Sequence, residues 1–215
     1  ATNMVHEQFV PEFKHYESAR DVLQIYYEYN DVMIAALRGP LTGALVGTFI
    51  QDIEHLHVFE NSLASALKFG GQSANFVVFS FDQAVKAKCV TLGVHFKLLP
   101  NTVARAIAKL DFGGISKTLG SSAFVRLWLA FLVADSDLAL AWQAPGNVWF
   151  AAPLKVLRGA RPKTEAAWAY MGDSDPRASP FFLSTDFFWA SAAPRTVHLL
   201  HELLLQFDLV LAWAS

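Results

Sequence analysis

Three clusters of glutamate and histidine have the spacing of metal ligands. They are Glu54 with His57, Glu12 with His15, and His198 with His201 and Glu202. Such Glu-x-x-His pairs hold the ions of di-metal helix bundles, which also need carboxylates from two intervening helices. The first two pairs are too close along the chain to leave room for those helices. We therefore predict no metal site and no cofactor, and interpret these histidines as hydrogen-bonded core or interface residues.

The sequence contains no motif of nucleophilic or phosphate chemistry. Cys89 is the one cysteine, and it is predicted to be a small packed side chain at the start of an alternating strand. No Gly-x-Ser-x-Gly elbow is present. Residues 113–118 end in Lys-Thr like a phosphate loop, but Ser116 and Asp111 stand where that motif requires glycine. We therefore predict that the protein is not an enzyme. A helical metalloenzyme that uses Glu54 and His57 is kept as an alternative.

Positive charge is concentrated in the middle of a weakly acidic chain. Residues 86–163 carry eleven basic and three acidic side chains, whereas the whole chain has a net charge of −2. Such asymmetry points to an anionic partner. The basic residues are Lys86, Lys88, Lys97, Arg105, Lys109, Lys117, Arg126, Lys155, Arg158, Arg161 and Lys163. We predict that they form a binding site for nucleic acid.

Aromatic residues are interleaved with these cations and offer faces on which single-stranded bases could stack. They are Phe96, Phe112, Phe124, Trp128, Trp142 and Trp149. Cations at intervals neutralise phosphates while rings stack on bases, so salt-sensitive binding with little sequence preference is expected. The alternative is that the basic middle pairs with the acidic ends of its own chain or of a neighbouring subunit.

The composition favours an intracellular protein that buries much apolar surface. Hydrophobic residues make up 53% of the 215 residues and charged residues only 17%, which suggests burial against partner subunits. A single cysteine and the lack of an Asn-x-Ser/Thr acceptor give no support for secretion. No signal peptide or transmembrane segment is predicted. We expect a cytoplasmic location, or one inside a virion.

The elements that must position these residues are predicted to be mostly helices. Apolar residues recur every three or four positions over 22–36 and again over 45–67, where Gly70-Gly71 ends the second helix. A short helix over 101–113 carries Arg105 and Lys109. A central buried helix is expected over 123–134. A long apolar terminal helix is predicted over residues 197–213.

A change of period predicts one small β element. Residues 75–81 are β-prone, and apolar and polar residues alternate over 90–98. The prediction is thus a mainly α, helical globular protein with a small antiparallel β element around residues 75–98. It forms a single domain over 1–215, with two intimate lobes (about 1–114 and 115–215) as the alternative. Residues 172–180 are predicted to form a loop.

These features together favour a structural assembly protein. In this hypothesis a self-associating subunit binds single-stranded nucleic acid without sequence specificity, as a nucleocapsid or coat protein does. It accounts for the low charge, the apolar terminal helix and the basic middle. The alternative is an accessory structural subunit of a large protein complex, in which the basic middle meets an acidic protein surface or lipid headgroups.

Overall fold

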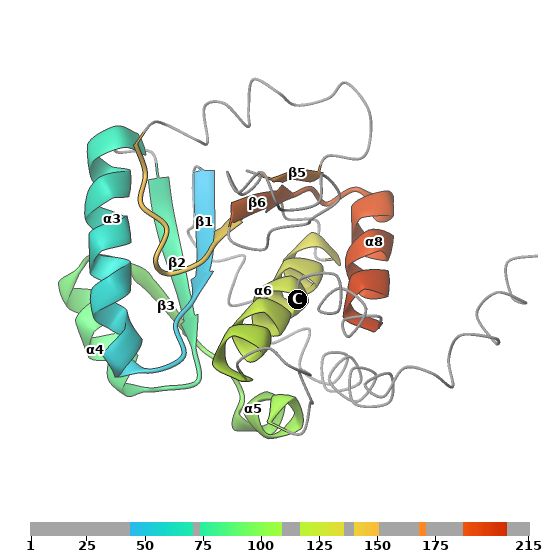
Figure 1. The fold of residues 1–215 in the computed structure, drawn as a ribbon, viewed down its shortest axis with the longest axis horizontal. Coiled ribbons are helices and arrows are strands. Elements are labelled where there is room, and N and C mark those ends of the chain that lie inside the picture. Colours follow the sequence, from blue (N-terminus) through green and yellow to red (C-terminus); the bar gives the residue numbers. More distant parts are fainter. Residues whose placement is uncertain are drawn as a thin grey trace, which may run out of the picture.

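A six-stranded mixed sheet forms the centre of the protein (Figure 1). The computed structural model describes residues 44–70, 74–108, 117–135, 140–150, 168–170 and 187–205. The strands lie in the order β3-β2-β1-β4-β6-β5. Their bounds are β1 Ala44–Phe49, β2 Ala74–Ser80, β3 His95–Leu98, β4 Leu140–Gln143, β5 Trp168–Tyr170 and β6 Phe187–Ala190. The strands β1 to β4 are parallel to one another, and β6 is antiparallel to both of its neighbours.

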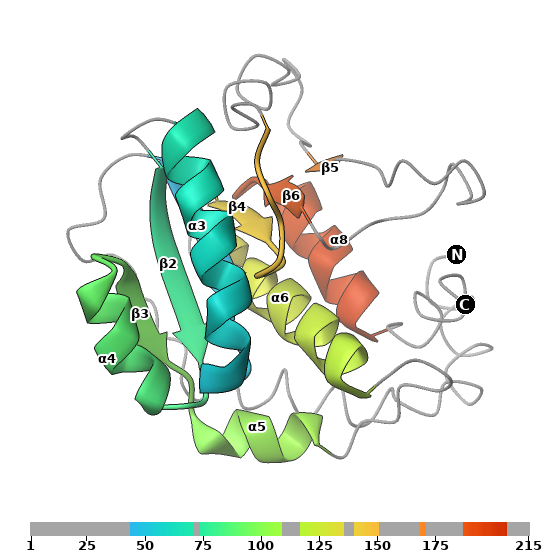
Figure 2. The ribbon, with the colours of Figure 1, turned by 60° about the vertical axis from the view of Figure 1, so that its left-hand side comes forward.

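Helices cover both faces of this sheet (Figure 2). They are the short 3-10 helix η2 Ile53–His55 and the α-helices α3 Leu56–Gly70, α4 Ala84–Thr91, α5 Asn101–Ile107, α6 Lys117–Asp135 and α8 Pro194–Leu205. The helices α3 and α4 lie on one face, and α6 and α8 pack together on the other. None of the helices in the described part of the chain is long and apolar enough to span a membrane.

The alternation of side chains along each strand divides the core into two layers. In β2, Phe76 and Val78 pack with α3, whereas Val77 and Phe79 pack with α6. Both sets are almost completely buried. A strand buried on both faces is apolar at nearly every position, which is the usual pattern of a parallel sheet covered by helices.

The predicted fold class is wrong. The protein is an α/β protein with a mostly parallel sheet, not a mainly α protein with a small antiparallel β element. Within the predicted β element around 75–98, β2 and β3 are strands, but they are parallel and α4 connects them. The described strands on both sides of residue 114 belong to the same sheet.

Two segments explain this error. The predicted helix over 45–67 begins as β1, because a continuous apolar run is shared by buried strands and buried helices. The alternating run over 90–98 starts inside α4, where Val90 is 69% exposed, and only its last four residues form β3.

Other predicted elements are confirmed. A helix ends at Gly70, a strand covers 74–80, and α5 carries Arg105. All residues from Phe124 to Ala134 in α6 are buried, as expected for a central helix. The terminal helix is confirmed as far as Leu205. The predicted helix over 22–36 and the predicted loop over 172–180 lie outside the described residues.

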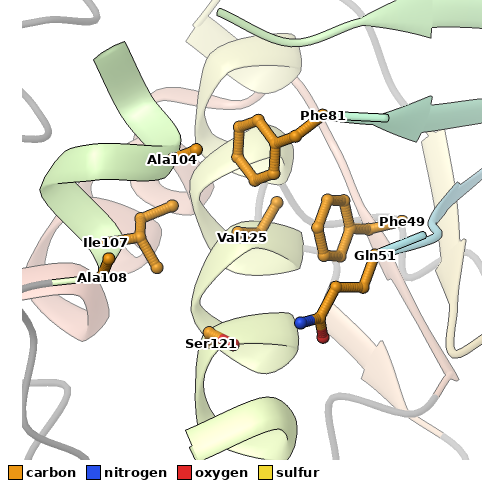
Figure 3. A pocket seen from close by; sticks show the side chains of 8 residues that line it. All are labelled: Phe49, Gln51, Phe81, Ala104, Ile107, Ala108, Ser121 and Val125. Carbon is orange, nitrogen blue, oxygen red and sulfur yellow. The ribbon is translucent and has the colours of Figure 1, made fainter. Parts of the chain in front are cut away.

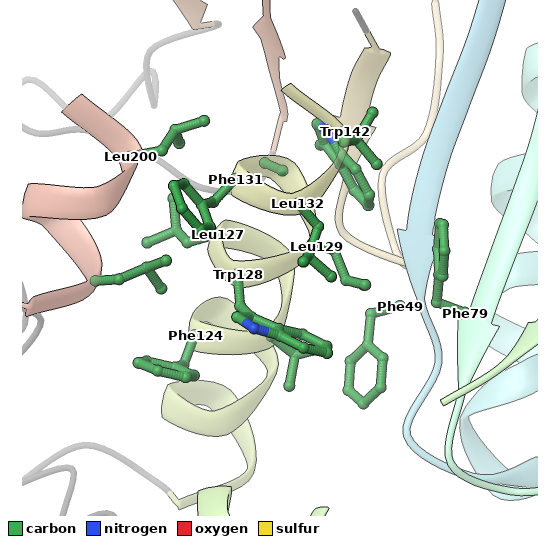
Figure 4. Packing of buried hydrophobic residues seen from close by; sticks show 14 of the residues in the cluster. Phe49, Phe79, Phe124, Leu127, Trp128, Leu129, Phe131, Leu132, Trp142 and Leu200 are labelled. Atoms are coloured by element: carbon green, nitrogen blue, oxygen red, sulfur yellow. The ribbon is translucent and has the colours of Figure 1, made fainter. Parts of the chain in front are cut away.

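A close contact between neighbouring strands joins the two halves of the sheet. Gly47 in β1 is the register partner of Trp142 in β4. A Cβ atom added to Gly47 would lie 2.5 Å from the Trp142 ring. Trp142 is fully buried and its ring also lies 5.6 Å from that of Phe79. Only glycine therefore leaves room for the indole over β1. Trp142 is one of the labelled side chains in the view of the core (Figure 4).

We expect the substitution Gly47→Ala to destabilise the protein by about 1–3 kcal/mol, because overpacking forces the Trp142 ring or the strands apart. Urea unfolding of the wild type and the variant measures this. The same substitution should cost less in a Trp142→Phe background, which lacks the outer indole ring. Strictly additive effects of the two substitutions would show that the contact is not responsible.

Candidate ligand-binding site

The carboxyl ends of the parallel strands β1 to β4 lie at one edge of the sheet, and a binding site is expected at that edge. The crossovers from β1 to β2 and from β2 to β3 run through α3 and α4 on one face, whereas β4 is reached through α6 on the other. From β1 the strand order continues through β2 to β3 on one side, whereas β4 continues the sheet toward β6 on the other side. In open α/β sheets, ligands bind outside the carboxyl ends of the strands at such a switch point.

A cavity of about 290 Å³ lies close to this edge (Figure 3). It is bounded by the carboxyl ends of β1 and β2 and by α5 and α6. The described residues that line it are Phe49, Gln51, Phe81, Ala104, Ile107, Ala108, Ser121 and Val125. None of them carries a charge, and six of the eight are apolar.

Aromatic and aliphatic side chains form the walls. The rings of Phe49 and Phe81 meet edge to face, with centroids 5.5 Å apart and an interplanar angle of 71°. This is a preferred geometry for aromatic pairs, so the two rings form a rigid corner. Ile107 and Val125 are buried in the two helices that complete the wall.

One polar group in the wall is left without a partner. Three buried side-chain polar atoms make no hydrogen bond with the described residues: Gln51 Oε1, Trp128 Nε1 and Trp142 Nε1. Of these three residues, only Gln51 lines the cavity. An unsatisfied buried acceptor costs about 1–3 kcal/mol. Because Gln51 Oε1 is buried, it does not face the open space of the cavity.

The helix N-termini beside the cavity are already occupied by carboxylates. Asp52 Oδ1 accepts hydrogen bonds from the backbone N–H of Glu54 at 3.0 Å and of His55 at 3.2 Å. Asp82 accepts from the backbone N–H of Ile53 at 3.1 Å and of Ala84 at 2.8 Å. Phosphates of nucleotides bind to such free N–H groups in other α/β proteins. Here the protein's own carboxylates take these positions and repel anions.

The Asp82 contact also fixes the cavity rim, because it joins the loop after β1 to the loop after β2. Its own N–H donates to Ser80 Oγ at 3.0 Å, at the end of β2. Gln51 and Phe81 therefore belong to two loops that are held together by hydrogen bonds.

Hydrogen bonding sets the ionisation of Asp52. Burial by itself would raise the pKa of Asp52. The hydrogen bonds from the His55 ring at 2.7 Å and from the two backbone N–H groups outweigh it, so the pKa lies below its usual value.

The described members of the predicted nucleic-acid-binding set lie on several elements. Lys86 and Lys88 lie on α4, Lys97 on β3 and Arg105 on α5. Lys88 Nζ forms an ion pair with Glu60 Oε1 at 2.8 Å. Arg126 is only 5% exposed. The side chains of Lys109, Lys117, Lys155, Arg158, Arg161 and Lys163 lie outside the described residues.

Most of the aromatic residues proposed to stack on bases belong to the core. Phe124, Trp128, Trp142 and Trp149 are at most 3% exposed, so their faces are covered by other side chains. Phe96 is half-buried against the α3 layer. Phe112 lies outside the described residues.

The candidate metal ligands are engaged within the protein. The His57 ring bonds to the backbone oxygen of Glu54, and His201 lies 3.7 Å from Glu202. In the described ranges no three His, Cys, Asp or Glu residues come together as a metal site would need. Glu12 and His15 lie outside those ranges.

The interpretation of Cys89 as a small packed side chain is confirmed. It is fully buried under β2 and β3, although in a helix rather than a strand. Burial raises the pKa of the thiol to about 11. At neutral pH it is therefore protonated and a poor nucleophile.

The sequence reasoning missed every residue of the cavity. Gln51 follows an apolar run that was assigned to a helix, so its place at a strand end was not visible. The signal available was the series of short apolar runs separated by helices, which is typical of a parallel sheet. Comparison with models of known protein families gives no match, and no curated protein is significantly similar in sequence.

We expect that in Asp52→Asn the free energy of unfolding falls less steeply as the pH is lowered through the acid range. Because the folded pKa of Asp52 is lowered, its contribution is present above the unfolded pKa of about 3.9 and is lost as the pH falls through the folded value. Asparagine still caps the helix but does not titrate. Urea unfolding midpoints across the acid range measure the slope. Equal slopes for both proteins would contradict the assignment.

Proposed function

We propose that the protein binds a small uncharged organic molecule in the cavity at the carboxyl ends of β1 and β2. The observation that carries the proposal is a concave cavity whose described lining residues are mostly apolar and include no charged side chain. Ligand pockets are commonly concave, mostly apolar and supplied with a few polar groups that orient the ligand.

The size and charge of the cavity support a neutral ligand. Its volume of about 290 Å³ lies at the small end of the range of ligand pockets. An ion would lose its hydration there without a charged side chain to replace it among the described lining residues, which is costly. Asp52 and Asp82 further disfavour an anion at the rim.

The nucleic-acid-binding assembly subunit is the second candidate. One observation favours it: three consecutive elements at the β3 edge carry Lys86, Lys97 and Arg105, and the first and last of these are exposed. If this candidate is correct, the purified protein should be an oligomer that carries nucleic acid, and high salt should remove that nucleic acid. A monomer free of nucleic acid would contradict it.

Filling the cavity tests the first candidate. In Ala104→Leu the larger side chain, placed on α5, takes up space beside Phe81. Fluorobenzene serves as a probe of apolar volume, and ¹⁹F NMR line broadening reports its binding. We expect at least a tenfold weaker affinity in the variant, equivalent to about 1.4 kcal/mol.

The matched control is Ala87→Leu on the exposed side of α4, far from the cavity residues in the fold. It should bind fluorobenzene like the wild type. Equal binding by both variants, or no binding by the wild type, would overturn the proposal.

A further inference from the structure

We propose that the outer edge of β3 binds an extended acidic segment of another protein, which joins the sheet as a further strand. This inference goes beyond the proposed function and does not depend on the cavity, so the fluorobenzene experiment does not test it. Three features of the surface carry it: the main-chain groups that β3 turns outward, the apolar side chains beside them, and the charge around them.

The main-chain groups at the outer edge of β3 follow from its pairing with β2, its one neighbour among the described strands. The Leu99 N–H donates to the Ser80 carbonyl at 2.8 Å, and Ser80 is the register partner of Leu98. In a parallel pair this directs the N–H and C=O of Lys97 toward β2, because successive residues point these groups to alternate sides. The N–H and C=O groups of Phe96 and Leu98 therefore point outward, and no hydrogen bond between described residues occupies them.

The flank of α4 beside this edge is identified by an ion pair on its other flank. Lys88 Nζ lies 2.8 Å from Glu60 Oε1 of α3, so this flank of α4 faces α3. Lys86 and Val90 are each two residues from Lys88, which is about 200° around the helix. They lie on the flank away from α3, where α4 borders β3 (Figure 2).

The surface beside the outer edge of β3 is partly apolar. Val90 is 69% exposed and Leu98 is 49% exposed. An added strand places every second side chain on the face that α4 covers, next to these two residues. Extended peptides bind to exposed sheet edges in this way, with main-chain hydrogen bonds and contacts of alternate side chains.

The charge of this surface selects an acidic partner. Residues 83–110 contain five lysine or arginine residues and no aspartate or glutamate. Lys86 on α4 and Arg105 on α5 are exposed, whereas Lys97 already has an interaction within the protein. Pairing of β3 with a second copy of itself would bring the same cations together, which is unfavourable. A nucleic acid would meet the charge but could not continue the hydrogen-bond ladder of the sheet.

A short peptide of alternating glutamate and valine is the probe, and the fluorescence anisotropy of an attached dye measures its binding to the full chain. An analogue with every peptide nitrogen methylated keeps the charges and side chains but has no N–H donors. We expect the analogue to bind about tenfold more weakly, because it cannot form the ladder hydrogen bonds. Equal affinities, or no binding of the first peptide, would overturn the proposal.

Removal of charge tests the position of the site. Lys86→Gln combined with Arg105→Gln should weaken binding of the peptide about fivefold, since exposed ion pairs are individually weak. The matched control is Lys88→Gln combined with Arg195→Gln, which removes the same charge from the α3 side of α4 and from the start of α8. It should bind the peptide like the wild type. Equal weakening in both variants would show that only net charge matters, and would overturn the proposal.

Amide hydrogen exchange tests the added strand without a variant. A saturating concentration of the peptide should slow exchange of the Phe96 and Leu98 N–H groups, but not that of Lys97, which already faces β2. Unchanged exchange at Phe96 and Leu98 would overturn the proposal. Single-stranded oligothymidylate that binds more tightly than the peptide, with the same dependence on Lys86 and Arg105, would overturn it in favour of nucleic acid.

Discussion

The pairing of β1 with β4 through Gly47 and Trp142 is the constraint on which the rest of the structure depends. It joins β1, which is followed by the crossover helices on one face, to β4, which is reached through α6 on the other face. The same pairing aligns Thr48 with Gln143, whose amide donates to Ser62 Oγ at 2.8 Å and accepts from Trp149 Nε1 at 2.8 Å. These buried hydrogen bonds attach α3 and the segment after β4 to the sheet. Because β1 is fixed in this way, Phe49 and Gln51 are placed at the cavity.

At the carboxyl edge of the sheet, Asp52 and Asp82 accept hydrogen bonds within the fold, whereas the buried oxygen of Gln51 accepts none from the described residues. Asp52 and Asp82 satisfy backbone N–H groups at the starts of η2 and α4 and join two loops. Gln51, between Ile50 and Asp52, is the residue in this loop whose buried oxygen has no partner in the described part of the chain. The two carboxylates therefore disfavour an anion at this edge, beside the apolar walls of the cavity. This combination is the physical basis of the proposed ligand site.

The sequence predicted those elements whose pattern is local. The buried helix α6, the start of α5 with Arg105, and the helix end at Gly70 follow from composition and capping alone. The strand β1 was not predicted, because an apolar run buried on both sides has no period that distinguishes it from a helix. The cavity was not predictable without the topology, since Gln51, Phe81 and Val125 come from separate segments that parallel crossovers bring together. The count of charged residues likewise identified the basic middle of the chain. It could not show that Arg126 is buried or that Lys88 forms an ion pair with Glu60.

A crystal structure of the protein grown with fluorobenzene would test the central claim most directly. The account predicts one fluorobenzene molecule between Phe49, Phe81 and Val125. Gly47 should remain in contact with the Trp142 ring. Fluorobenzene bound elsewhere, with the space between α5, α6 and the ends of β1 and β2 filled by other side chains, would contradict the account.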